Sequence, residues 1–85
     1  MLVMKFGGTS LAGATEMRRV GGIVRRLTGR KPVVVVSAMA GVTDDLIALA
    51  DEAVAGSPRR VGRRLDRLRG RHRKVAGLLD LAGRE

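Results

Sequence analysis

Two short segments in the first half of the sequence contain the residue types that phosphoryl transfer uses. Gly7-Gly8-Thr9-Ser10 follows one apolar run, and the loop at residues 37–43 follows a second. Glycine allows a phosphate to approach the main chain closely, and backbone N–H groups near the start of a helix can hold an anion. Lys5 is the last cation before the first loop. Its ammonium group could neutralise charge on a phosphoryl group during transfer.

The same residues also have ordinary structural explanations, which the sequence alone leaves open. A Gly-Gly pair after a strand is most often a tight turn. Ser37 and Thr43 could be a polar strand end and a helix cap, and Lys5 could be a solvated charge at a strand end. The first loop lacks the Gly-Lys-Ser/Thr of a Walker loop, and the sequence contains no dinucleotide-binding fingerprint. A phosphate site here would therefore be of a different kind.

Short apolar runs predict two strands, and each candidate loop follows one of them. Residues 2–6 form an apolar run that ends at Gly7-Gly8, and the β-branched residues 33–36 follow Pro32. A continuous β-branched run is typical of a strand that is buried on both faces of a parallel sheet. Open parallel sheets bind ligands beyond the carboxyl ends of their strands, which is where both loops would lie.

The spacing of apolar residues predicts a first amphipathic helix over residues 14–28. Gly21-Gly22 in its middle could mark close approach to a neighbouring element, and Gly29 is placed to cap its end. This helix would connect the two strands. A right-handed crossover would then set the strands side by side and parallel.

Two further helices are expected after the second loop. One would begin at Thr43 as its cap, carry Asp44 and Asp45 in its first turn, and be closed by residues 56–58. The other would cover residues 58–81. The order strand, helix, strand, helix, helix indicates an α/β fold. Two parallel strands alone leave open sheet edges, so we expect the chain to be an incomplete part of a larger domain.

The positive charge of the chain is concentrated in the third predicted helix. The formal net charge is +9, and residues 59–74 contain eight Arg and one Lys against Asp66 alone. Such a window could attract nucleic acid through its phosphates. Its cations surround much of the helix, however, and Phe6 is the only aromatic residue, so stacking platforms for bases are lacking. Nucleic acid is therefore a disfavoured partner.

Composition also restricts metal binding and location. With no Cys and one His, the sequence has neither a disulfide framework nor a zinc-binding cluster, and we assign no metal ligand. The apolar start is soon interrupted by Lys5 and two glycines, unlike a secretory signal peptide. The longest mostly apolar stretch, residues 32–42, is far below the roughly 18 residues that span a bilayer. We expect a cytoplasmic protein with no membrane partner.

Both loop segments resemble motifs of a known enzyme family. Met4-Lys5-Phe6-Gly7-Gly8-Thr9-Ser10 resembles the opening signature of aspartokinases. Residues 34–44, Val-Val-Val-Ser-Ala-Met-Ala-Gly-Val-Thr-Asp, resemble their second conserved block. The likeness is firm from Met1 to about Ala55 and continues loosely through the third helix. There His72 resembles a His that the family often carries, and we expect a structural or exposed role for it.

The resemblance implies the amino acid kinase fold, a three-layer α/β/α sandwich. Residues 1–85 would be its amino-terminal strand-helix-strand-helix-helix portion. The implied reaction transfers the γ-phosphate of Mg-ATP to the β-carboxylate of L-aspartate and gives 4-phospho-L-aspartate, the first step of lysine, threonine and methionine biosynthesis. The implied partners are therefore L-aspartate and ATP, with Mg²⁺ entering as part of Mg-ATP.

The resemblance also assigns roles by matching position. Lys5 would be the catalytic residue, and Phe6, Gly7 and Gly8 would bind ATP phosphate together with it. The positions that would surround the amino acid substrate all carry hydroxyl groups: Thr9, Ser10, Ser37 and Thr43. The carboxy-terminal part of the kinase domain, which binds adenine and ribose, would lie beyond Glu85. We therefore expect the isolated 85 residues to be inactive and the complete enzyme to be a homo-oligomer.

Three other interpretations are left by the sequence. Another amino acid kinase, acting on glutamate, acetylglutamate, carbamate or a nucleoside monophosphate, could use similar loops, although Phe6-Gly7-Gly8-Thr9-Ser10 favours aspartate. A basic nucleic-acid-binding module would use the Arg-rich window at residues 59–74. A non-catalytic remnant would keep the opening unit of the fold without its chemistry.

Overall fold

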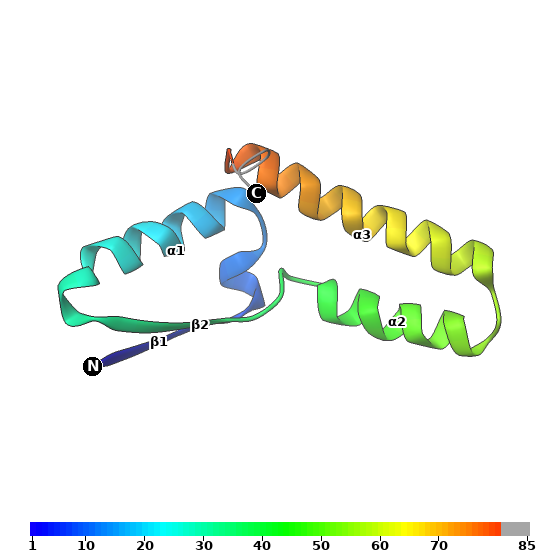
Figure 1. The fold of residues 1–85 in the computed structure, drawn as a ribbon, viewed down its shortest axis with the longest axis horizontal. Coiled ribbons are helices and arrows are strands. Elements are labelled where there is room, and N and C mark those ends of the chain that lie inside the picture. The colour runs from blue at the N-terminus through cyan, green and yellow to red at the C-terminus, as the bar shows by residue number, and fades with distance from the viewer. Residues whose placement is uncertain (81–85) are drawn as a thin grey trace. The chain divides into compact units, whose positions relative to one another are not determined.

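The computed structural model describes residues 1–80 and contains two compact units, Met1–Ala40 and a second unit that begins at Gly41. The first unit contains β1 (Leu2–Phe6), the 3-10 helix η1 (Gly8–Leu11), α1 (Ala14–Arg26), the 3-10 helix η2 (Thr28–Arg30) and β2 (Pro32–Val36) (Figure 1). The second unit contains α2 (Val42–Val54) and α3 (Pro58–Leu78). The predicted element order and the α/β class are confirmed. The third helix ends at Leu78, earlier than the predicted end at about Leu81, which itself lies outside the described residues.

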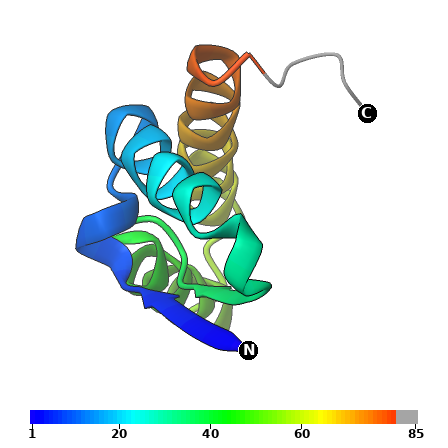
Figure 2. The ribbon, with the colours of Figure 1, turned by 90° about the vertical axis from the view of Figure 1, so that its left-hand side faces the viewer.

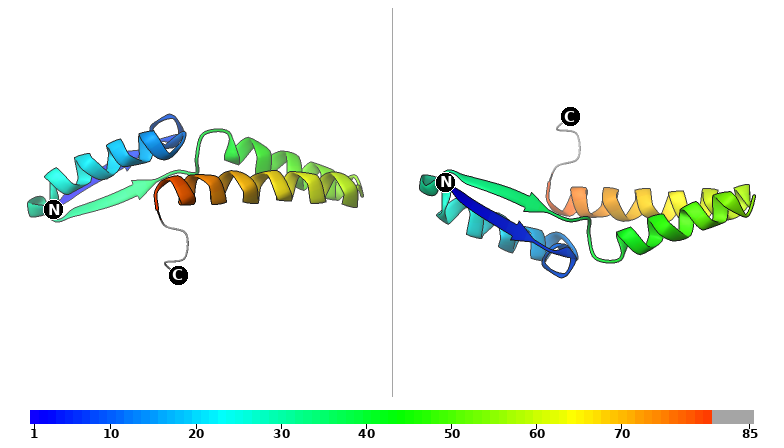
Figure 3. Two further views of the ribbon diagram at one scale, coloured as in Figure 1. Left: turned by 90° about the horizontal axis from the view of Figure 1, so that it is seen from above. Right: turned by 90° about the horizontal axis from the view of Figure 1, so that it is seen from below.

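β1 and β2 form a two-stranded parallel sheet, as the crossover rule predicted. All five residues of each strand are paired, beginning with Leu2 opposite Pro32. Figure 3 shows the two strands side by side and pointing the same way. Figure 2 shows α1 along one side of the strands, where it makes the connection between them. Both strands therefore deliver their carboxyl ends to the same edge of the sheet.

The side chains of β1 alternate between a covered face and an exposed face. Leu2, Met4 and Phe6 are half-buried. Val3 and Lys5 are exposed, because successive side chains of a strand point to opposite faces. The half-buried set faces α1, since Phe6 lines a small cavity with residues of that helix. Lys5 therefore lies on the face of the sheet opposite α1.

The valines of β2 are more exposed than the sequence predicted. Their exposed fractions range from 39% for Val34 to 56% for Val36. The expectation that this strand is buried on both faces is therefore wrong for the described residues. A continuous β-branched run is normally covered by layers on both faces of a sheet. The described residues of this unit supply one neighbouring strand and one α-helix, so β2 has the composition of an interior strand but incomplete cover.

The apolar stripe of α1 is confirmed, but the end of the helix differs from the prediction. Val20 on this stripe is buried. Gly29 does not cap the helix; it lies within η2, and the residue in the left-handed region is Lys31, with a φ of 51°. A Cβ built on Gly21 or Gly22 would meet no other described atom within 4 Å. The predicted close approach at this glycine pair is therefore not found in residues 1–80.

The second unit is a hairpin of two helices. The predicted break at residues 56–58 is confirmed, and Gly56 adopts the left-handed conformation with a φ of 73°. The N–H of Gly56 donates to Ala53 O at 3.1 Å, and the N–H of Ser57 donates to Glu52 O at 3.2 Å. These two bonds form a Schellman motif, which ends a helix and satisfies its last carbonyls. Pro58 then occupies the start of α3, where its missing N–H is not needed.

Candidate functional site

The first candidate loop leaves β1 at Phe6 and forms one turn of 3-10 helix. Gly7 is extended, with φ −83° and ψ −179°, and is the N-cap residue of η1. The N–H of Ser10 donates to Gly7 O at 3.1 Å, which closes the turn. Thr9 and Ser10 are both exposed. The loop thus presents two hydroxyl-bearing residues next to a glycine pair.

The second candidate loop is anchored to the end of the first strand. The N–H of Ser37 donates to Phe6 O at 3.2 Å, which extends the parallel pairing beyond the strand ends. The Ser37 hydroxyl donates to Ala38 O at 2.8 Å. These two bonds fix Ser37 beside the point at which β1 ends. The interpretation of Ser37 as a polar strand end and its assignment to the site are therefore compatible.

The two loops meet at Gly8. A Cβ built on this residue would lie 3.5 Å from Ala40 Cα, 3.6 Å from Ala38 O and 3.7 Å from Ser37 Oγ. These are ordinary van der Waals separations, so the main chain at Gly8 lies against the second loop. The structure therefore brings Gly7, Gly8 and Ser37 into one cluster beyond the carboxyl ends of both strands, where open parallel sheets bind ligands.

Neither steric crowding nor a positive φ requires glycine at the two positions of the pair. Gly7 is exposed, and a Cβ built on it would meet no other described atom within 4 Å. Among the glycines of residues 1–80, positive φ values occur at Gly41 and Gly56, so Gly7 and Gly8 do not need glycine for their φ angles. The predicted tight turn is present, since the Ser10 N–H bond to Gly7 O closes it, but its backbone angles do not require glycine at either position. Glycine at position 7 suits the N-cap of η1, and it also leaves the main chain open to close approach by a ligand.

Lys5 and Phe6 lie on opposite faces of β1. The side chain of Phe6 lines a cavity of about 90 Å³ together with Ser10 and residues of α1. Ligand sites for small molecules are typically about 300–1,000 Å³, so this cavity is a packing defect between β1 and α1. Lys5 is exposed on the other face, and its ammonium group is available to a ligand.

Thr43 belongs to the second unit, where it is the second residue of α2. The N-cap residue of this helix is Gly41, which is left-handed with a φ of 83°, and no side chain caps the helix. The prediction that Thr43 is the cap is therefore wrong, because glycine tolerates this conformation and lets the helix begin earlier. Thr43 is exposed and its hydroxyl is not used for capping. Asp44 and Asp45 lie in the first turn, as predicted.

An ion-pair network in the second unit was not expected from the sequence. Arg64 donates from Nε and Nη2 to the carboxylate of Glu52 at 2.7–3.2 Å, and from Nη1 to Asp45 Oδ1 at 3.2 Å. The hydrogen bonds from Arg64 hold the pKa of Glu52 below its usual value of 4.5, although partial burial opposes this shift. The same contact raises the pKa of Arg64. The only signal in the sequence was the turn at residues 56–58, which folds α3 back along α2.

The single His of the chain, the acidic residues and the helices show the following within the described residues. His72 is exposed, and its Nδ1 donates to Leu68 O in the same helix at 2.7 Å, in keeping with a structural or exposed role. Within residues 1–80, no group of three or more His, Asp or Glu side chains is placed to hold a metal ion. No helix in this part of the chain has both the length and the apolar character that a bilayer crossing requires.

Comparison with known proteins connects both loops to one family. The family model described as the amino acid kinase family matches residues 1–81. Aspartokinase 3, chloroplastic, of Arabidopsis thaliana is 46% identical over 52 residues, which cover 61% of this chain and 9% of that protein. The aspartokinase of Mycobacterium tuberculosis (strain H37Rv) is 42% identical over 62 residues, which cover 71% of this chain and 15% of that protein.

The matched segments are a small part of the curated relatives but most of this chain. The chain spans between 9% and 15% of the length of these two curated relatives. The family model, in contrast, covers every described residue. The parallel pair of strands with its connecting helix agrees with the α/β fold of that family. The chain therefore belongs to the amino acid kinase family.

Proposed function

We propose that the protein carrying this chain is an aspartate kinase and that the loops after β1 and β2 take part in its phosphoryl transfer. An oxygen of the L-aspartate β-carboxylate would form a bond to the γ-phosphorus of Mg-ATP. The bond between that phosphorus and the β,γ-bridging oxygen would break, and ADP would leave with its electrons. The product would be 4-phospho-L-aspartate. The contact of Gly8 with Ser37, Ala38 and Ala40 at the strand ends is the observation that carries this proposal.

The choice of aspartate rests on the relatives. Those from Arabidopsis thaliana and Mycobacterium tuberculosis are both named aspartokinases. A carboxylate substrate also suits the residues in the loops, because a carboxylate with a usual pKa of about 3.9 is already ionised near neutral pH and needs no general base. The demand is instead for positive charge, since two anions must approach each other.

Lys5 is the residue assigned to this demand. It is exposed on the face of β1 opposite α1, one residue before Phe6 and the glycine pair. Its ammonium group would stabilise the negative charge on the phosphoryl oxygens during transfer. Phe6 would contribute through its position at the strand end, because its side chain packs toward α1. Gly7 and Gly8 would let the phosphate approach the main chain.

The hydroxyl-bearing residues of the first unit, Thr9, Ser10 and Ser37, would surround the amino acid. The Ser37 hydroxyl already donates its proton to Ala38 O, so its remaining lone pairs suit a donor such as the α-ammonium group of aspartate. The hydroxyls of Thr9 and Ser10 are on exposed residues of η1. Thr43, in the second unit, is assigned to the substrate by the family resemblance alone; it is exposed, and its hydroxyl does not cap α2.

The proposal is tested with the purified protein at its natural length. Acyl phosphate formed from Mg-ATP and aspartate is trapped with hydroxylamine as aspartyl hydroxamate, and the same assay is run with glutamate and acetylglutamate. Release of ADP is followed with carbamate and a nucleoside monophosphate. We expect kcat/KM for aspartate to exceed that for every other acceptor by at least about tenfold, a difference of about 1.4 kcal/mol in transition-state binding. Preference for another acceptor would replace aspartate kinase by that other amino acid kinase.

A further inference from the structure

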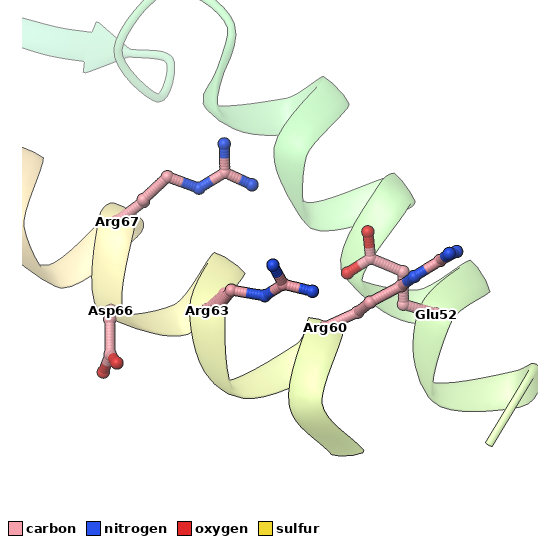
Figure 4. A pocket seen from close by; sticks show the side chains of 5 residues that line it. All are labelled: Glu52, Arg60, Arg63, Asp66 and Arg67. Carbon is pink, nitrogen blue, oxygen red and sulfur yellow. The ribbon is translucent and has the colours of Figure 1, made fainter. Parts of the chain in front are cut away.

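Three arginines of α3 share one groove beside α2. Arg60, Arg63 and Arg67 line this groove with Glu52 and Asp66, and its volume is about 650 Å³. Spacings of three and four residues place the arginines on one side of the helix. Figure 4 shows their side chains extending toward α2, whereas the carboxylate of Asp66 points away from the three guanidinium groups.

The chain itself balances the charge in this groove only in part, because Arg60 and Arg67 attract the carboxylate of Glu52 and help to lower its pKa. Glu52 is the one carboxylate directed toward the arginines in Figure 4, and both of its oxygens accept hydrogen bonds from Arg64. Within residues 1–80, no hydrogen bond or ion pair engages the guanidinium groups of Arg60, Arg63 and Arg67. Three like charges on one side of a groove repel one another, and an anion that entered between them would remove this cost.

We propose that this groove binds an oligophosphate, a small ligand with two or three linked phosphate groups. Arg67 lies seven positions after Arg60, a rise of about 10 Å along the helix. Anionic groups must therefore be spread along the groove to reach all three side chains. Guanidinium groups bind phosphate oxygens through paired, charge-assisted hydrogen bonds. The groove volume falls within the range of about 300–1,000 Å³ typical of small-molecule sites. This inference does not rest on the proposed kinase activity.

A phosphate ligand explains the arrangement better than a nucleic acid backbone does. The arginines that line the groove are a subset of the basic residues of α3. Arg59, Arg69 and Arg73 of the same helix are exposed and do not line the groove. A nucleic acid drawn by total charge would use both sets, whereas an oligophosphate in the groove uses one.

The test is a calorimetric titration of the natural-length protein with sodium tripolyphosphate near physiological salt. The groove variant is R60Q/R63Q/R67Q, and the matched control is R59Q/R69Q/R73Q, which removes the same charge from the same helix. We expect the groove variant to weaken binding at least tenfold and the control to change it less than about twofold. Equal weakening in both variants would overturn the proposal in favour of diffuse charge attraction, and so would absence of tripolyphosphate binding by the unsubstituted protein.

Three additional measurements separate loss of the site from loss of the fold and identify the ligand. Circular dichroism should show unchanged helix content in the groove variant, because its arginines make no ion pairs that folding would lose. If that variant fails to fold, the single change Arg63→Gln must still weaken binding by at least threefold, and an unchanged affinity would refute the proposal.

ATP is titrated in parallel, and only the binding that the groove changes remove is counted. Equal affinities for ATP and tripolyphosphate would show that the phosphates alone are recognised, and tighter ATP binding would identify a nucleotide as the oligophosphate.

A parallel titration with duplex DNA distinguishes an oligophosphate site from a nucleic-acid-binding helix. DNA binding that both triple variants weaken equally, together with no tripolyphosphate binding, would identify α3 as a nucleic-acid-binding helix and overturn the proposal. Tripolyphosphate binding that only the groove variant loses supports it.

Discussion

The guanidinium group of Arg64 contacts both carboxylate oxygens of Glu52, at distances of 2.7–3.2 Å. The same guanidinium group reaches Asp45 Oδ1 at 3.2 Å. Asp45 lies in the first turn of α2 and Glu52 near its end. The side chain of Arg64 therefore bridges two carboxylates that lie about two turns apart on α2. Arg63, one residue earlier, has no such partner among the described residues. Neighbouring arginines of α3 therefore have different roles.

Substitution of Arg64 should destabilise the helical hairpin. Arg64→Gln would leave Glu52 and Asp45 without their cation, so we expect a lower midpoint of thermal unfolding, followed by circular dichroism at neutral pH. Arg63→Gln is the matched control and should leave the midpoint unchanged or raise it, because it removes only repulsion. Equal effects of the two changes would show that the Arg64 contacts contribute nothing measurable.

The Glu52 pair also predicts a dependence of stability on pH. The pKa of Glu52 is lowered in the folded chain, mainly by its hydrogen bonds from Arg64, from a usual value of 4.5. The unfolded state therefore binds more protons near this pH, and stability rises with pH. The contribution is present above pH 4.5 and is lost as the pH falls through the lowered pKa. Urea unfolding should show that Glu52→Gln destabilises at pH 6 and destabilises less as the pH falls below 4.5. A difference that did not shrink on acidification would contradict this assignment.

The turn between α2 and α3 should be sensitive at Gly56. Its φ of 73° lies in the left-handed region, so Gly56→Ala should lower the free energy of unfolding by roughly 1–2 kcal/mol. Gly62→Ala, within α3, is the control. Apart from its chain neighbours and the backbone of its own helix, a Cβ built on Gly62 would meet no described atom within 4 Å, so alanine there should stabilise by up to about 1 kcal/mol. Denaturant unfolding of both variants tests the opposite signs, and stabilisation by Gly56→Ala would contradict the Schellman turn.

A change at Gly7 separates the catalytic explanation of the glycine pair from a structural one. Alanine fits at this position because its Cβ would meet no other described atom within 4 Å and the φ of −83° suits any residue. Gly7→Ala should therefore leave the unfolding midpoint unchanged and lower kcat/KM for Mg-ATP by at least about tenfold, since the added methyl group obstructs the phosphate. Gly29→Ala has equally open surroundings and should leave activity unchanged. Full activity of Gly7→Ala would remove Gly7 from the phosphate site.

The sequence predicted the elements of this fold better than it predicted their ends. β1 was predicted over its observed bounds because an apolar run stops at two glycines. The parallel pairing followed from the handedness of the crossover. The cap of α2 was wrong, because the backbone conformation of Gly41 decides where the helix begins and periodicity carries no information about that angle. Gly29 was wrong for the same reason, since Lys31 takes the left-handed conformation.

Contacts between side chains of different elements could not be predicted from the sequence, whereas one contact between the loops could be inferred in outline. The meeting of Gly8 with the second loop follows from parallel pairing, so this juxtaposition was inferred in outline. The partner of Arg64 depends on the register of α3 along α2, which is set by the three-dimensional turn at Gly56. The exposure of Val36 could not be predicted from the sequence either. A β-branched run indicates that a strand is suited to burial between two layers, but it does not indicate whether both layers are present.

The most direct test of the account is the steady-state kinetics of Lys5→Ala in the natural-length protein, measured as aspartyl hydroxamate formation from Mg-ATP and aspartate. Lys74→Ala removes an equally exposed lysine of α3 and is the control. We predict that Lys5→Ala lowers kcat by at least about a hundredfold while KM for aspartate changes by less than about threefold, because Lys5 would act on the transferring phosphoryl group. An unchanged kcat in Lys5→Ala would contradict the central claim that Lys5, near the end of β1, stabilises the transferring phosphoryl group.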